Sequence, residues 1–241
     1  TYFFKSLICL YAIYFQVFKP FYAYKYLYHI MIAMLISSIA LTSCQEHEDF
    51  PDTSVRIGHV LCTDGVVTPL EECIREGRTP IAVVFHINHD DAVEGSGFAV
   101  YLHDLSPVAF ADSIGTKQNT SADTQALDGN ANTYAVFSTA AIGSPMAGSV
   151  FSMWEYGQSA YVPSVAQMQL LYHAKSIVNV YLERAGGQPL PDESDGCWYW
   201  TSTEVKGQEQ AKAWLYSIGS GSRHETPKDE SHKVRPVVTI Y

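Results

Sequence analysis

The chain has 241 residues and a formal net charge of −10, from 15 basic and 25 acidic side chains. This length suffices for one well-filled domain with additional segments. Residues 1–44 contain three lysines and no acidic residue, so the rest of the chain holds 12 basic against 25 acidic side chains, a net charge of −13. A region this acidic lacks the basic surface that nucleic-acid binding requires and is poorly suited to lying on an anionic bilayer, so neither partner is expected.

The first 30 residues are unusually aromatic, because tyrosine and phenylalanine account for 12 of them, and none is methionine. A transmembrane helix is one interpretation, but Lys19-Pro20 interrupts the apolar run before it reaches the roughly 20 residues that a span needs. We interpret residues 1–30 as a leader translated upstream of the natural start, which would be Met31 or Met34.

Residues 31–43 have the pattern of a signal peptide. Their short apolar run ends in Leu41-Thr42-Ser43-Cys44, which resembles the lipobox of bacterial lipoproteins, and a signal peptide needs only about 7–15 apolar residues. The resemblance implies export, lipidation of Cys44, and a location in the outer membrane or at the cell surface of a Gram-negative bacterium. A start at Met31 leaves no basic residue before the apolar run, although Lys25 supplies one if translation begins earlier. The alternative is a buried helix that ends at a free cysteine.

The acidic stretch 44–55 is expected to form a tether between the lipidated cysteine and a domain over residues 56–241. Three strands are predicted in the first part of this domain, at Arg56–Cys62, Thr79–Asn88 and Gly97–Leu105. The second of them is apolar on both alternating faces, which is typical of a central strand.

The loop between the second and third strands carries three carboxylates, those of Asp90, Asp91 and Glu94. Oxygen ligands of this kind suit Ca²⁺, but their spacing matches no EF-hand loop. We therefore expect a solvated acidic loop and no metal site, with a calcium site as the alternative.

The middle of the domain is predicted to be helical in two places. A short helix is expected at Asn130–Ala141, with loops at residues 106–124 and 143–148 on either side. The principal helix is predicted to begin after Pro163, because Ser164 is a good N-cap and Gln167 stands in the capping-box position. Apolar residues at 3–4 spacing continue past an expected break at Ser176. Gly186-Gly187 is expected to end the helix as a C-cap.

Three further strands are predicted near the C-terminus, at residues 196–205, 213–219 and 232–241, because each is rich in aromatic and β-branched residues. Their order resembles the bacterial DUF1566 family, whose pattern is roughly YWSSTE, then AW, then K and VRPV. The matching segments are YWTSTE at 199–204, Ala213-Trp214 and Lys233–Val237. GRTPIAVVF at 77–85, GFAV at 97–100 and DGNANT at 128–133 extend the likeness to most of the domain.

This family is related to C-type-lectin-like domains, sulfatase-modifying factors and retroelement-diversified binding proteins. The resemblance implies an α+β fold of the C-type-lectin-like kind, with twisted antiparallel sheets, two or three flanking helices, and both termini paired in one sheet. We therefore expect Val234–Ile240 to pair with the strand near Arg56–Leu61.

The sequence offers little for catalysis. Beyond Cys44, the domain holds Cys62, Cys73 and Cys197, with no C-x-x-C pair for zinc, and a Cys62–Cys73 disulfide is possible in an oxidising compartment. Formylglycine-generating relatives need two reactive cysteines near the C-terminus, where only Cys197 stands. No G-x-S-x-G, H-E-x-x-H or phosphate-loop motif is present.

Calcium-dependent sugar binding is not implied either. The stretch 188–192 superficially echoes the lectin calcium motif, but Leu190 stands where a carboxylate or amide ligand is needed. We therefore expect no catalytic residue, no metal and no cofactor.

The resemblance to diversified binding proteins implies a ligand surface on and between the last strands, at Lys206–Lys212 and Ser220–Lys228. The candidate contacts are Tyr199, Lys206, Gln208, Tyr216, Ser220, Ser222, Arg223 and His224. The alternative is that these are ordinary polar turns. The expected scaffold residues are Trp200, Ser202, Glu204 and Arg235, and we expect Glu204 and Arg235 to form a buried ion pair.

Together these patterns predict a lipid-anchored, non-catalytic binding or adhesion module at the cell surface, with an unidentified surface protein or glycan as its ligand. One alternative is a structural accessory subunit of a surface or fimbrial assembly. A second alternative is a hydrolase whose site the sequence does not reveal.

Overall fold

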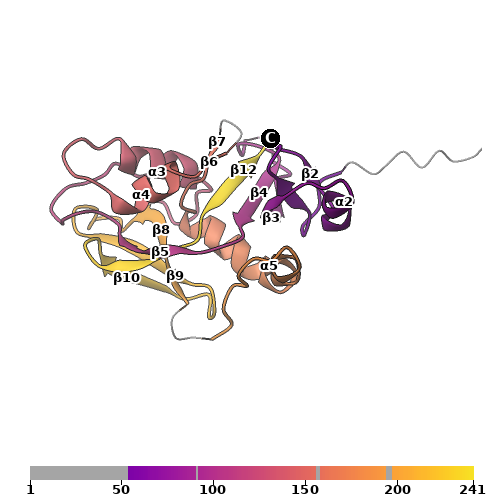
Figure 1. The fold of residues 1–241 in the computed structure, drawn as a ribbon. Coiled ribbons are helices and arrows are strands. Elements are labelled where there is room, and N and C mark those ends of the chain that lie inside the picture. Colours follow the sequence, from indigo (N-terminus) through magenta and orange to yellow (C-terminus); the bar gives the residue numbers. More distant parts are fainter. Residues whose placement is uncertain (1–53, 91, 156–157, 194–196) are drawn as a thin grey trace, which may run out of the picture. The chain divides into compact units, whose positions relative to one another are not determined.

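The computed structural model describes residues 54–90, 92–155, 158–193 and 197–241 (Figure 1). The predictions for the leader, the signal peptide, Cys44 and nearly all of the tether lie outside the described residues, as does Asp91 of the acidic loop. Within the described part, no helix combines the length and apolarity that crossing a membrane would need.

The first sheet has five antiparallel strands in the order β12-β4-β3-β1-β2. Its strands are β1 (Val60–Cys62), β2 (Val67–Thr68), β3 (Pro80–Ile87), β4 (Gly97–Tyr101) and β12 (Val237–Ile240). The central strand β3 pairs with β1 on one side and with β4 on the other. Its consecutive residues Val83 and Val84 point to opposite faces of the sheet, and both are fully buried. The prediction of a strand buried on both faces is therefore confirmed.

The second sheet has the order β10-β9-β8-β11-β5. Its strands are β5 (Leu105–Ala109), β8 (Trp198–Glu204), β9 (Lys212–Ser217), β10 (Arg223–Pro227) and β11 (Ser231–Val234). Only β8 and β11 run parallel, and the other neighbours are antiparallel. A small hairpin pairs β6 (Trp154–Glu155) with β7 (Gln158–Ser159).

Four helices are described: α2 (Leu70–Arg75), α3 (Gly129–Phe137), α4 (Pro145–Phe151) and α5 (Val165–Arg184). The predicted capping box is present at α5, because the Ser164 side chain accepts from the backbone of Gln167 and the Gln167 side chain accepts from the Ser164 backbone. Gly186 has a φ of +77°, and Gly187 N donates to Leu182 O over 2.8 Å. This is the Schellman geometry in which glycine is favoured, so the predicted C-cap is confirmed.

Helix α5 lies against strands of both sheets, and this arrangement creates two cores (Figure 1). Side chains alternate across a strand, so each sheet contributes one face to each core. The α5 core includes Phe85 of β3 and Tyr199 of β8. The opposite core includes Val84 of β3 and Trp200 of β8, which pack with residues of α3 and α4.

The α+β prediction is confirmed, but the expected strand pairing is wrong. Strands β1 and β12 do belong to one sheet, yet β12 pairs with β4, and the β3–β4 hairpin separates it from β1. The predicted strand 232–241 is in fact two strands in different sheets. They are divided at Arg235-Pro236, where proline has no N–H to continue a ladder.

Two predicted loops contain regular structure. Strand β5 occupies the start of the predicted loop 106–124, and its Pro107 is tolerated because β5 is an edge strand. Helix α4 lies in the predicted loop 143–148, where Ser144 caps the helix and Pro145 occupies its first turn.

Three other boundaries differ from expectation. Helix α5 continues through Ser176, whose exposed side chain points away from the core and so does not interrupt it. The first predicted strand begins only at Val60, because a turn joins His59 N to Arg56 O over 3.1 Å. No strand was predicted within Ser220–Lys228, but this segment contains strand β10.

Candidate functional site

Six of the eight predicted ligand contacts are exposed around β9 and β10. They are Lys206 and Gln208 between β8 and β9, Ser220 and Ser222 between β9 and β10, and Arg223 and His224 at the start of β10. The outer position of β10 in the second sheet leaves this region at the border of the domain (Figure 1).

The two predicted aromatic contacts are not exposed. Tyr199 and Tyr216 are 0% and 2% exposed, because they pair in register on the face of the sheet that α5 covers. The hydroxyl of Tyr199 donates to the Asp104 carboxylate over 2.9 Å, and burial together with this carboxylate raises the tyrosine pKa. Tyr216 packs edge-on against Tyr172 of α5. Their assignment as ligand contacts is therefore wrong.

Trp214 is an aromatic residue of this region that was not among the predicted ligand contacts. It is half-buried, and the Arg223 guanidinium lies 5.6 Å from its ring centroid. Its indole Nε1 is buried and has no hydrogen-bond acceptor among the described residues. No strand was predicted at Arg223–Pro227, so the pairing of β9 with β10 that brings Arg223 to Trp214 was not expected.

Polar side chains continue this face of β9 and β10. Glu225, which stands opposite Trp214 in the ladder, accepts from Gln208 Nε2 over 3.0 Å and from Lys212 Nζ over 3.3 Å. We refer to Gln208, Lys212, Trp214, Arg223 and Glu225 together as the β9–β10 surface. It combines an aromatic ring, a guanidinium, a carboxylate and an amide, so it offers both apolar contact and hydrogen bonds.

On the other face of β10, the ring of His224 lies 6.1 Å from that of Trp198 in an edge-on arrangement. His224 Nδ1 is 3.1 Å from the Thr226 hydroxyl. His224 is exposed and Trp198 is half-buried. Both faces of this edge strand therefore carry a basic or imidazole side chain against a tryptophan.

The scaffold residues beneath this region are buried, but the predicted ion pair is wrong. Glu204 binds Lys228 over 2.8 Å, and these side chains are 1% and 0% exposed. Glu204 also accepts from the backbone of Gln118 and from Thr120, while Lys228 donates to Thr116 O and Gln118 Oε1. The pair thus fixes residues 116–120 to the end of β8.

Arg235 binds Asp104 instead, over 2.9 Å, and also donates to the carbonyls of Leu102 and Gln188. Parallel pairing of Lys233 with Tyr199 places Arg235 about level with residue 201, so Glu204 is roughly 10 Å further along β8. This spacing explains why Glu204 and Arg235 do not meet.

The other two scaffold residues are fully buried. Trp200 donates its indole N–H to Val108 O over 3.0 Å, which ties β8 to β5 across β11. The Ser202 hydroxyl has no hydrogen-bond partner among the described residues.

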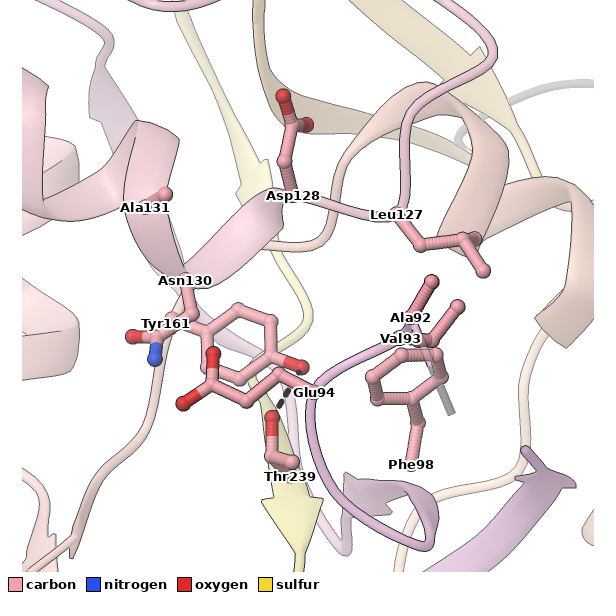
Figure 2. A pocket seen from close by; sticks show the side chains of 10 residues that line it. All are labelled: Ala92, Val93, Glu94, Phe98, Leu127, Asp128, Asn130, Ala131, Tyr161 and Thr239. Atoms are coloured by element: carbon pink, nitrogen blue, oxygen red, sulfur yellow. Dashed lines mark hydrogen bonds between the residues drawn. The ribbon is translucent and has the colours of Figure 1, made fainter. Parts of the chain in front are cut away.

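A pocket of about 300 Å³ lies between the β3–β4 loop, the start of α3, and β12 (Figure 2). Val93, Phe98 and Leu127 line one side with apolar surface, and Tyr161 and Asn130 lie on the other. No sequence pattern predicted this pocket, because its lining residues come from segments far apart in the chain.

Two carboxylates, Glu94 and Asp128, also line the pocket. Burial raises the pKa of Asp128, and Glu94 accepts from the Tyr241 hydroxyl over 2.6 Å. The Tyr161 hydroxyl is 3.0 Å from the Thr239 hydroxyl, and burial raises the pKa of this phenol as well (Figure 2). The pocket therefore offers acceptors to a ligand that donates hydrogen bonds.

The described residues contain no group of three histidine, cysteine or acidic side chains that could hold a metal ion. The calcium alternative for the acidic loop involves Asp91, which lies outside the described residues.

Comparison with models of known protein families finds none that matches this chain, and comparison with curated proteins also finds no match.

Proposed function

We propose that this chain is an exported, lipid-anchored binding or adhesion module that engages a surface protein or a glycan through the β9–β10 surface. The observation that carries the proposal is the Arg223–Trp214 contact, in which the exposed guanidinium of the edge strand β10 lies over the half-buried indole of the neighbouring strand β9. Tryptophan and arginine supply a large share of the binding energy at protein interfaces. We further propose that the fold is C-type-lectin-like, which the placement of β1 and β12 in one sheet supports.

The rigidity of the surrounding scaffold supports this assignment. The Glu204–Lys228 pair and the Arg235–Asp104 pair hold the strands and loops around β8 with buried hydrogen bonds. A surface carried by such a scaffold loses little conformational entropy when it binds a ligand, so more of its contact energy appears as affinity.

The test is binding of the full-length protein to an array of glycans and an array of extracellular protein domains. Arg223→Ala should weaken binding about tenfold, because truncating an arginine anchor at an interface typically costs more than 1 kcal/mol. Arg75→Ala is the matched control, since Arg75 is an exposed arginine of α2, outside the β9–β10 surface. It should leave binding unchanged.

A third variant separates the surface from the pocket. Asp128→Asn removes one pocket carboxylate and should not affect a ligand held at the β9–β10 surface. If Asp128→Asn abolishes binding while Arg223→Ala does not, the ligand occupies the pocket and the proposed surface is wrong. Equal affinities for wild type and Arg223→Ala would also refute the proposal.

A further inference from the structure

Two buried cysteines lie in contact in the first sheet. Cys62 ends β1 and Cys73 lies in α2, eleven residues later, and their sulfur atoms are 3.0 Å apart. Both side chains are fully buried, and both are in the thiol form. A disulfide has sulfurs about 2.05 Å apart, so a bond between them requires a sulfur movement of only about 1 Å.

The backbone around the pair holds this approach in place. Cys62 N donates to Val66 O in the turn that follows β1, and Arg78 N donates to Cys73 O after α2. Gly77, with a φ of +69°, lets the chain leave α2 and return to β3. The contact is therefore fixed from both sides by hydrogen-bonded elements.

We propose that Cys62 and Cys73 form an intramolecular disulfide that fastens α2 to β1, and that the bond forms during folding, before α2 packs. The oxidant is a small disulfide such as oxidised glutathione. One cysteine thiolate attacks a sulfur of the oxidant and releases one thiol, which gives a mixed disulfide. The second thiolate then attacks the protein sulfur of that mixed disulfide and releases the second thiol. The two protein sulfurs lose two electrons, and the oxidant gains them with the two protons.

The environment of the two thiols determines when the disulfide can form. Burial and the neighbouring Cys73 raise the pKa of Cys62 to about 12. The thiolate is the attacking species, so exchange is slow once both sulfurs are covered. The same cover protects the finished bond from reduction. This inference does not depend on the proposed binding function.

Cys197 provides an internal control. Its sulfur is buried and lies 2.9 Å from the Ser217 hydroxyl, in the second sheet. It should remain a thiol under conditions that join Cys62 to Cys73.

The experiment is refolding of the full-length, reduced protein from denaturant with a mixture of oxidised and reduced glutathione, followed by alkylation and peptide mapping. We expect a peptide pair joined through Cys62 and Cys73, lighter by two hydrogen atoms, and alkylated Cys197. The oxidised protein should melt several degrees above the reduced one. The folded, reduced protein should gain the bond at least tenfold more slowly under the same redox mixture.

Cys73→Ser should abolish both the joined peptide and the difference in melting temperature, and Cys197→Ser should preserve both. If the wild-type chain fails to refold, the same mapping on protein purified from cells with an oxidising cytoplasm replaces that step. Recovery of Cys62 and Cys73 as alkylated thiols by either route would overturn the proposal. Oxidation of the folded protein as fast as of the refolding chain would overturn the proposed timing.

Discussion

At the scale of single residues, two buried ion pairs organise the second sheet. Glu204–Lys228 and Arg235–Asp104 each have one or both partners fully buried. Burying a charge is costly, and removing one partner of such a pair typically destabilises a protein by about 3–5 kcal/mol, because the other charge is stranded. The two pairs use different segments, so their contributions should be independent.

Chemical unfolding of a double-mutant cycle tests this arrangement. Glu204→Gln and Lys228→Met should each lower the free energy of unfolding by about 3–5 kcal/mol, and the double mutant should lose less than the sum. The losses of unfolding free energy caused by Glu204→Gln and by Arg235→Met should be additive in the double mutant, with no coupling between the two positions. The control is Lys212→Met, which breaks a partly exposed pair with Glu225 and should cost at most about 1 kcal/mol. Strong coupling between positions 204 and 235 would contradict the described pairing.

His86 on β3 should make the stability depend on pH. Burial, with a smaller contribution from His89, lowers the pKa of His86 in the folded state. The unfolded chain therefore binds a proton at His86 more readily, so acid favours unfolding. The stability that this histidine contributes is present above its unfolded pKa of about 6.5 and is lost as the pH falls through the lower folded value.

Thermal melts between about pH 8 and pH 5 check this effect. The melting temperature of the wild type should fall towards acid, and His86→Gln should flatten that dependence. His103→Gln, which removes an exposed histidine between β4 and β5, is the control. If it flattens the curve as much as His86→Gln does, the effect does not come from His86.

At the scale of elements, helix ends and helix interiors place opposite demands on glycine. Gly186 adopts a φ of +77° after α5, and a Cβ there would meet nothing within 4 Å, so the cost of Gly186→Ala is purely conformational. Gly148 lies inside α4 in equally open space but has no positive φ. Gly186→Ala should destabilise by about 1 kcal/mol, and Gly148→Ala should stabilise by about 0.5–1 kcal/mol. Denaturant titration of both variants measures the two signs, and equal signs would contradict this account.

Elements with strong local signals were predictable from the sequence. The β3 segment is apolar on both faces, and α5 carries a capping box and a terminal glycine pair, so both appear where they were expected. Strand β10 was not predictable, because its sequence Arg-His-Glu-Thr-Pro contains few apolar residues and shows no alternation of apolar and polar side chains. It is a strand because it pairs with β9, a tertiary effect that local patterns do not contain.

The same limit applies to the site. Arg223 and His224 were predicted to be exposed from their place in a polar segment, and they are. Tyr199 and Tyr216 were misassigned because burial depends on α5, which crosses the sheet from elsewhere in the chain. Lys228 lies between a proline and an aspartate, and nothing local indicates that it is 0% exposed. Which face of a strand is covered is a property of topology rather than of pattern.

At the scale of the whole molecule, the proposed lipid anchor determines where the domain is found. Cys44→Ser should abolish incorporation of a fatty-acid analogue and move the protein from the membrane fraction to the soluble fraction. Cys197→Ser is the matched control, because it removes a buried thiol of the domain and should leave labelling and fractionation unchanged. Undiminished labelling of the Cys44→Ser protein would refute the anchor.

At Arg235-Pro236 the chain passes from β11 in the second sheet to β12 in the first, so the first sheet is completed only when the end of the described chain has been synthesised. Strand β4 ends at Tyr101, but its partner β12 ends at Ile240, about 140 residues later. At roughly 5–20 residues per second, a ribosome needs about 7–28 s to cover that distance. Throughout this interval β4 lacks its outer neighbour, and the four buried side chains of β12 are missing from the core. A nascent chain therefore remains incompletely folded until residues 237–240 emerge, and this delay would favour the export proposed above, because an incompletely folded chain passes a narrow channel more easily than a folded one.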